Sequence, residues 1–141
     1  MNENAKKWVE VLKSDRFKQA RHVLHNVDED SYCCLGVACQ LAIEAGVSLK
    51  QRDFFSESDG ANITAYGDND NFTSLPEEVQ NWLGLDTDVG MLPRPNDITR
   101  LEESLAGLND TGKTFADIAA IIESEPEGLF KNVTPEDGLV G

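Results

Sequence analysis

A run of apolar residues in the first third of the chain constrains the fold more than any other feature. The stretch YCCLGVACQLAIEA, residues 32–45, is apolar on nearly every side of a helix. Acidic and capping residues precede it and Gly46 follows it, so the pattern predicts a helix over about 32–45. Only Gln40 and Glu44 would face outward. Because a helix without a polar face is normally buried, we expect the rest of the domain to pack around this segment.

Weaker signals predict three further helices. An apolar stripe with a spacing of three and four residues predicts an amphipathic helix over residues 4–14. Two pairs have the spacing of a capping box, in which the side chains at the first and fourth positions bond each other's backbone N–H groups. Ser74 with Glu77 and Thr114 with Asp117 therefore predict two later helix starts.

The remaining segments favour β-structure or are ambiguous. Residues 15–27 fit a helical and a strand pattern equally well, and both interpretations stay open. Residues 47–73 mix β-prone pairs with Gly, Asn and Asp, which predicts a short hairpin. The sum is an α+β fold of about four helices around a buried central helix, with a small sheet or hairpin, in one domain, 1–141. The last residues, about 131–141, have little to bury and are expected to form a loose tail.

Charge is distributed unevenly. Residues 1–52 carry eight Lys or Arg and seven Asp or Glu, a net charge of +1, whereas residues 53–141 carry four and nineteen, a net charge of −15. The acidic part would repel a phosphate backbone, so we expect no direct nucleic-acid binding. No apolar stretch reaches the roughly 18 residues of a membrane helix. Without a secretory signal, and with three clustered cysteines, the chain is expected in the cytoplasm. Self-association is left open.

The three cysteines, Cys33, Cys34 and Cys39, could be metal ligands, nucleophiles or core residues. On a helix they point roughly 100–140° apart, so no pair shares a face as zinc ligands would, and we expect no metal. Cys33 and Cys34 fall in the first helical turn, where the helix dipole favours a thiolate. Their apolar neighbours instead favour buried thiols that pack as small hydrophobic side chains. No motif of a known enzyme class or cofactor site is present, which favours a non-enzymatic protein.

A basic segment immediately before the central helix suggests an anion site. Its candidate ligand-binding residues are Arg16, Lys18, Arg21 and His25. Together with unpaired backbone N–H groups near Cys33 and Cys34, they could bind phosphate or carboxylate. Alternatively, these cations only neutralise the acidic remainder of the protein. Asn109 and Asp110, in a polar turn, could bond the same ligand or satisfy local backbone groups.

Four segments carry a resemblance to a known family: KKWVEVLKS, YCCLGVACQLA, LPEEVQNWLGL and LNDTGKTFADIAAIIE. Together they resemble an uncharacterised family of small proteins of tailed bacteriophages and some bacteria. The Tyr-Cys-Cys-Leu-Gly-Val-x-Cys segment is its most specific part. The resemblance implies an accessory protein in the cytoplasm of an infected bacterial host, and it supplies no catalytic residues. Accessory proteins of this size often act against host defences, by sequestering a nucleotide signal or by occupying a host protein.

These observations predict a function and two alternatives. We expect a non-enzymatic domain that antagonises host defence by binding and sequestering a small anionic, nucleotide-type ligand, without a cofactor. The first alternative is an interaction protein whose acidic face, set by residues 53–141, blocks a basic host protein or mimics DNA. The second alternative is a cysteine-dependent enzyme that uses Cys33 or Cys34.

Overall fold

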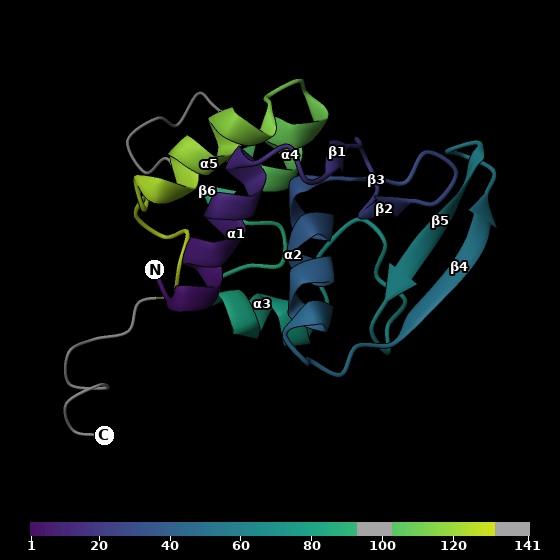
Figure 1. The fold of residues 1–141 in the computed structure, drawn as a ribbon, viewed down its shortest axis with the longest axis horizontal. Coiled ribbons are helices and arrows are strands. Elements are labelled where there is room, and N and C mark those ends of the chain that lie inside the picture. Colours follow the sequence, from purple (N-terminus) through teal and green to yellow (C-terminus); the bar gives the residue numbers. More distant parts are fainter. Residues whose placement is uncertain (93–102, 132–141) are drawn as a thin grey trace.

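The computed structural model describes residues 1–92 and 103–131, which form a mixed α/β fold (Figure 1). The helices in these residues are α1 (Glu3–Lys13), α2 (Cys34–Glu44), α3 (Glu77–Leu83), α4 (Leu105–Asp110) and α5 (Phe115–Glu123). None of these five is long and apolar enough to cross a membrane. The expected loose tail lies outside the described residues, apart from Lys131.

Five strands form the main sheet, and two short strands form a separate ribbon. The main strands are β1 (Lys18–Gln19), β2 (His25–Asn26), β3 (Ser31–Tyr32), β4 (Gln51–Ser56) and β5 (Ala61–Tyr66). Their order across the sheet is β1-β3-β2-β5-β4, with β1 parallel to β3 and the other pairs antiparallel. The ribbon pairs β6 (Met91–Leu92) with β7 (Glu103–Ser104). In Figure 1 the β4–β5 hairpin lies on one side of α2, and α1 and α5 lie on the other.

The predicted hairpin within residues 47–73 is therefore confirmed as β4 and β5. The ambiguous residues 15–27 contain two short strands and no helix. Their backbone groups pair with distant segments: Ala20 N–H donates to Tyr32 O at 2.7 Å, and Val27 N–H donates to Asn62 O at 2.8 Å. The helical and the strand pattern of residues 15–27 are equally good locally, and pairing with these distant partners decides in favour of strands.

The predicted central helix is confirmed as α2. Every residue from Cys34 to Cys39 is buried, Gln40 is half-buried and Glu44 is exposed. Helices α1, α3 and α4 contact α2, whereas α5 packs mainly against α1 and α4. The expected arrangement of four helices around α2 is therefore not confirmed, although α2 does lie at the centre of the hydrophobic core. The apolar stripe of α1 faces this core, and Trp8 Nε1 donates to Cys34 O at 2.9 Å.

Gly36 allows α2 to approach the loop between β1 and β2. A Cβ atom built on Gly36 would lie 1.7 Å from the carbonyl oxygen of Leu24, far inside any allowed contact. The same carbonyl accepts a hydrogen bond from Cys33 N–H at 3.3 Å. Only glycine fits this position, because the backbone of one segment lies directly against the backbone of the other. This contact gives a physical reason for the glycine of the Cys-Cys-Leu-Gly segment.

One of the two predicted capping boxes is present. In α5, Thr114 Oγ1 accepts from Asp117 N–H at 3.1 Å and the Asp117 carboxylate accepts from Thr114 N–H at 3.2 Å. Hydrogen bonds from the backbone N–H and the side chain of Thr114 lower the pKa of the Asp117 carboxyl. The box predicted for Ser74 and Glu77 is wrong: Pro76 occupies the N-cap of α3, and no side chain caps that end. A residue that precedes proline is disfavoured in the helical conformation, so Leu75 cannot readily begin the helix and α3 starts at Glu77.

Candidate protein-binding surface

The basic residues proposed for an anion site do not converge on one point. Arg16 forms an ion pair with Glu44, at the far end of α2 from the proposed site. Lys18 Nζ lies 3.8 Å from a carboxylate oxygen of Glu29. Arg21 is exposed. Two of the four cations are thus paired with nearby acids, as the neutralising interpretation predicts.

His25 is held within the sheet. Its ring stacks on Tyr32, with the ring centroids 4.1 Å apart and the planes 5° from parallel. Nδ1 lies 3.0 Å from Thr64 Oγ1, and Nε2 lies 3.1 Å from the Asp30 carboxylate. Both ring nitrogens are therefore already engaged by this chain, so a ligand would have to displace an existing partner to bond His25.

Asn109 occupies the N-terminus of α2, where the anion was expected. The side chain is fully buried. Its Oδ1 accepts from Cys34 N–H at 3.1 Å and from Gln19 Nε2 at 2.8 Å, and its Nδ2 donates to Ala20 O at 2.7 Å. Cys33 Sγ accepts from the N–H of Gly36 at 3.4 Å. These groups already bond two of the helix N–H groups that an anion would need, those of Cys34 and Gly36.

Asp110 fixes the neighbouring loop. Its Oδ1 accepts from His22 N–H at 2.7 Å, and its Oδ2 lies 3.5 Å from His22 Nδ1. His22 has a φ of 72°, a backbone conformation that is uncommon outside glycine. Asn109 and Asp110 therefore bond backbone groups, which is one of the two interpretations. The residues that they bond, Ala20, His22 and Cys34, are far from them in the sequence.

The cysteine side chains are core residues. Cys33, Cys34 and Cys39 are free thiols, and all three are buried. Burial raises the pKa of Cys33 from 9.0 to about 12, and it raises the pKa values of Cys34 and Cys39 well above 9.0. Desolvation of the thiolate outweighs the helix dipole here. Since the thiolate is the nucleophile, these buried thiols are poorly suited to catalysis. In the described ranges, no three Cys, His, Asp or Glu side chains gather as metal ligands would.

A different surface stands out by its charge. Residues 53–92 contain nine Asp or Glu and no Lys, Arg or His. All nine carboxylates are on exposed residues. Of the nine, only Asp70 lies within 4.0 Å of a cation in the described part of the chain, namely 3.3 Å from Arg52. Counting basic residues in short windows would have found this stretch, which the half-chain totals conceal.

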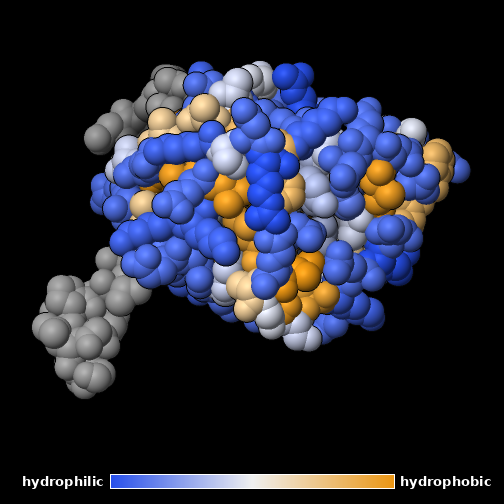
Figure 2. Space-filling view, viewed as in Figure 1, coloured by the Kyte–Doolittle hydropathy of each residue, from blue (hydrophilic) through white to orange (hydrophobic). Residues whose placement is uncertain are grey.

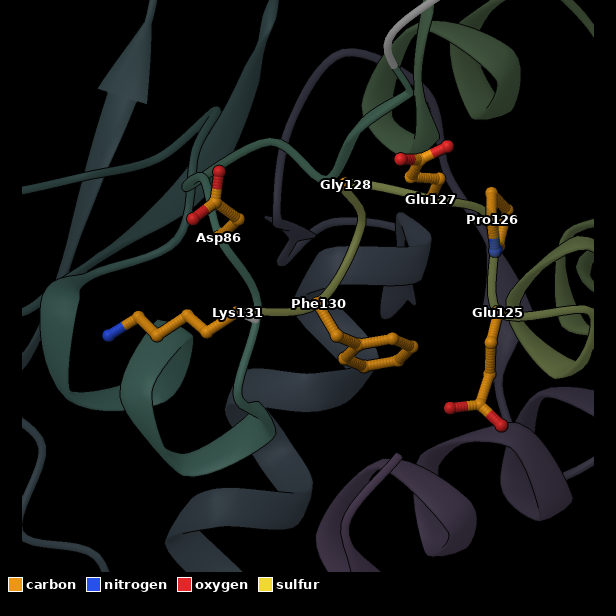
Figure 3. A pocket seen from close by; sticks show the side chains of 7 residues that line it. All are labelled: Asp86, Glu125, Pro126, Glu127, Gly128, Phe130 and Lys131. Carbon is orange, nitrogen blue, oxygen red and sulfur yellow. The ribbon is translucent and has the colours of Figure 1, made fainter. Parts of the chain in front are cut away.

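A hollow of about 470 Å³ lies at the C-terminal end of α3 (Figure 3). Its carboxylates are those of Asp86, Glu125 and Glu127. In Figure 3 the Phe130 ring lies between Glu125 and Lys131. Glu125 is paired with the ammonium group of Met1 at 2.7 Å, and Lys131 Nζ donates to Asn81 Oδ1 at 2.8 Å. Asp86 and Glu127 have no such cation among the described residues, so the hollow keeps a negative character.

A second hollow, of about 290 Å³, lies at the N-terminal end of α3. Its lining consists of Asp68, Asn69, Asn71, Pro76, Glu77 and Glu78. Carboxylates thus flank both ends of one short helix. We call the exposed carboxylates of residues 68–88 and the two hollows the α3 surface. Closely spaced carboxylates produce a negative potential that attracts cationic groups and steers a basic partner.

Most of the face shown in Figure 2 is hydrophilic. In Figure 2 hydrophobic residues reach the surface only in small, separate patches, some of them over the sheet. Phe55 of β4 is the one large hydrophobic residue among those described that is classed as exposed, at 58%. An extended apolar interface is therefore absent from the face in view, and charge is the dominant feature available for recognition.

The fold and its surface define a class: a small mixed α/β protein with a buried, cysteine-bearing central helix and an acidic exterior. The chain belongs to the family described as Domain of unknown function (DUF8296), whose model matches residues 1–126. No curated protein and no solved structure matches this chain. The hollow at the N-terminal end of α3 lies wholly within the matched residues, whereas the hollow in Figure 3 extends beyond them.

Proposed function

We propose that this protein is a non-enzymatic interaction protein that binds a basic partner through the α3 surface. The observation that carries the proposal is the stretch of residues 53–92, with nine exposed carboxylates and no basic residue. Six of the nine, those of residues 68–88, belong to the α3 surface, which is complementary to a patch of Lys and Arg side chains. Charges of this kind increase the association rate and select the partner by sign more than they add to affinity.

The setting of this proposal comes from the resemblance to tailed-bacteriophage proteins. We take the partner to be a basic protein of the bacterial host, and the consequence of binding to be interference with a host defence. The acidic surface would compete with nucleic acid for a basic groove of that protein. A small anionic ligand fits less well, because Asn109 and Cys33 already satisfy N–H groups at the N-terminus of α2. A cysteine enzyme fits less well because its thiols are buried.

The test compares two variants that remove the same number of charges. The first neutralises the hollow at the N-terminal end of α3 with Asp68→Asn, Glu77→Gln and Glu78→Gln. The matched control neutralises three exposed carboxylates of the N-terminal part with Glu10→Gln, Asp15→Asn and Glu29→Gln. Tagged wild type and both variants are used to capture proteins from a bacterial lysate, and the captured proteins are identified and purified.

We expect wild type and the control to retain the same basic protein and the α3 variant to lose it. With the purified partner, the dissociation constant should rise on the order of tenfold or more between low and moderate salt, and the α3 variant should show a weaker salt dependence. Equal retention by the two triple variants would exclude the α3 surface. Tight binding of a nucleotide by the wild type in calorimetry would favour the anionic-ligand hypothesis instead.

A further inference from the structure

The main sheet has one long strand at an open edge. Strand β4 is the last in the order β1-β3-β2-β5-β4 and pairs only with β5 among the described strands. Figure 1 shows it at the periphery, on the side of β5 away from the helices. At six residues it is far longer than β1, the two-residue strand at the opposite edge. An exposed edge of this length can pair with another extended chain.

The hydrogen-bonding pattern fixes which residues face the open edge. Gly67 N–H donates to Lys50 O at 2.8 Å, next to the aligned pair Gln51 and Tyr66. In an antiparallel pair the residues that bond the partner strand alternate along each strand. Lys50, Arg52 and the even-numbered residues after them therefore bond β5. The N–H and C=O groups of Gln51, Asp53 and Phe55 point away from β5 and are available to a sixth strand.

The side chains at these outward positions restrict the occupant. Asp53 is exposed, and only its Oδ1 is engaged, by the Thr64 hydroxyl at 2.6 Å. Phe55, two residues further on the same face, is 58% exposed. An added strand would place one side chain opposite the carboxylate of Asp53 and another against the ring of Phe55.

A second copy of this chain is a poor occupant. A twofold register centred on Asp53 places Asp53 opposite Asp53, and like charges opposite each other are destabilising. The register centred on Phe54 overlaps an equal length of β4 and pairs Asp53 with Phe55, but it offers the carboxylate no cationic partner. The net charge of −14 per chain adds further repulsion. The same net charge attracts a basic chain, and a cationic residue opposite Asp53 complements its carboxylate.

We propose that the open edge of β4 binds an extended segment of a basic protein as a sixth strand. This segment carries Lys or Arg opposite Asp53 and an apolar residue, two positions away, against Phe55. The main-chain hydrogen bonds supply affinity, and the two side-chain positions supply selectivity. The inference rests on the proposed function for the basic character of the partner, but it concerns the outer edge of β4, which adjoins the α3 surface through the Arg52–Asp70 ion pair and shares none of its carboxylates.

The test selects ligands without assuming a partner. The full-length protein is used to select from a random twelve-residue peptide library displayed on yeast, and the two most enriched peptides are synthesised. We expect enriched sequences to share Lys or Arg two positions from an apolar residue. A selection without this pattern would overturn the inference.

Substitutions at the edge then separate backbone from side-chain contributions. Phe55→Thr keeps the outward N–H, whereas Phe55→Pro removes it without touching the bonds to β5. We expect Phe55→Pro to weaken binding of the selected peptides by about tenfold relative to Phe55→Thr. Asp53→Lys should change the selected residue opposite position 53 from Lys or Arg to Asp or Glu. Equal binding by the two Phe55 variants, each with an unchanged thermal unfolding profile, would overturn the inference.

Two further measurements distinguish the outcomes. Sedimentation of wild type should show a monomer; a dimer that Phe55→Pro abolishes would mean that a second copy occupies the edge and would overturn the inference. The selected peptides are also tested on the α3 variant with Asp68→Asn, Glu77→Gln and Glu78→Gln. Binding within about twofold of wild type is expected, and a loss like that of Phe55→Pro would place the peptides at α3 instead. Failure of lysate capture alone would reject the proposed function and leave the peptide result unaffected.

Discussion

Asn109 and Cys34 are 75 residues apart, and the side-chain oxygen of Asn109 accepts the backbone N–H of Cys34 at 3.1 Å. The same amide bonds Gln19 and Ala20, so one buried side chain connects α4, the start of α2 and the edge of the sheet. Asn109 thereby takes the place at the helix N-terminus that the sequence suggested for an anion.

Replacing Asn109 should destabilise the protein strongly. Asn109→Ala leaves the Cys34 N–H and the Ala20 C=O buried without partners, at a cost of about 2–4 kcal/mol in the free energy of unfolding. Urea unfolding followed by far-ultraviolet circular dichroism measures the change. The control is Asn69→Ala at an exposed position, which should change the free energy by less than about 0.5 kcal/mol. Similar values for the two variants would contradict a bridging role for Asn109.

Gly36 should be irreplaceable by alanine. The added Cβ would meet the Leu24 carbonyl oxygen at 1.7 Å, so α2 or the β1–β2 loop must move. We expect Gly36→Ala to cost about 2–4 kcal/mol, although alanine is the better helix former. Gly107→Ala in α4 is a helical control, because its Cβ would meet only a side-chain oxygen, Ser104 Oγ at 3.2 Å. That change should stay within about 1 kcal/mol, and a mild effect of Gly36→Ala would refute the close contact.

The buried thiols should make stability fall at high pH. The pKa of Cys33 rises from 9.0 to about 12 on folding, so between these values the unfolded chain has lost a proton that the folded chain retains. Ionisation of the thiols does not affect the free energy of unfolding below about pH 8. Above about pH 9, each such thiol lowers the free energy of unfolding by about 1.4 kcal/mol per pH unit. Urea unfolding under reducing conditions at pH 8, 9 and 10 measures this slope.

The control for that slope is Cys33→Ala. This variant removes one titrating group, so the decrease in its unfolding free energy between pH 9 and 10 should be smaller by about 1 kcal/mol than in wild type. An identical slope would mean that the Cys33 thiol is not protected from ionisation by burial. Rapid alkylation of native wild type by iodoacetamide at neutral pH would lead to the same conclusion.

Salt should stabilise the folded protein. The net charge of −14 produces repulsion among the carboxylates, and added ions screen it. We expect the melting temperature to rise by roughly 2–5 °C between about 20 and 300 mM sodium chloride. The variant with Asp68→Asn, Glu77→Gln and Glu78→Gln should show a smaller rise. A melting temperature that falls with salt would indicate that ion pairs such as Lys13 with Glu123 outweigh the repulsion.

Local patterns predicted the elements whose determinants are local. The all-round apolar run indicated α2 correctly, and the spacing of Thr114 and Asp117 indicated the start of α5. The same spacing failed at Ser74 and Glu77, because Pro76 disfavours the helical conformation at Leu75 and α3 begins only at Glu77. Sequence patterns could not show that Asn109 fills the end of α2, since that contact depends on segments brought together only by the fold. For the same reason the sequence could not show that Arg16 and Lys18, two of the basic residues near position 20, are paired with Glu44 and Glu29.

The position of Asn109 has a consequence for how the chain is assembled. During synthesis the N-terminal residues emerge first. The Cys34 N–H at the start of α2 can bond Asn109 only after about three quarters of the sequence has been made. Until then the amide of Cys34 and the carbonyl of Ala20 depend on water, and the segment around them cannot close. Helix α4 therefore completes the first part of the molecule, and a chain interrupted before residue 109 would expose the surface that α4 covers.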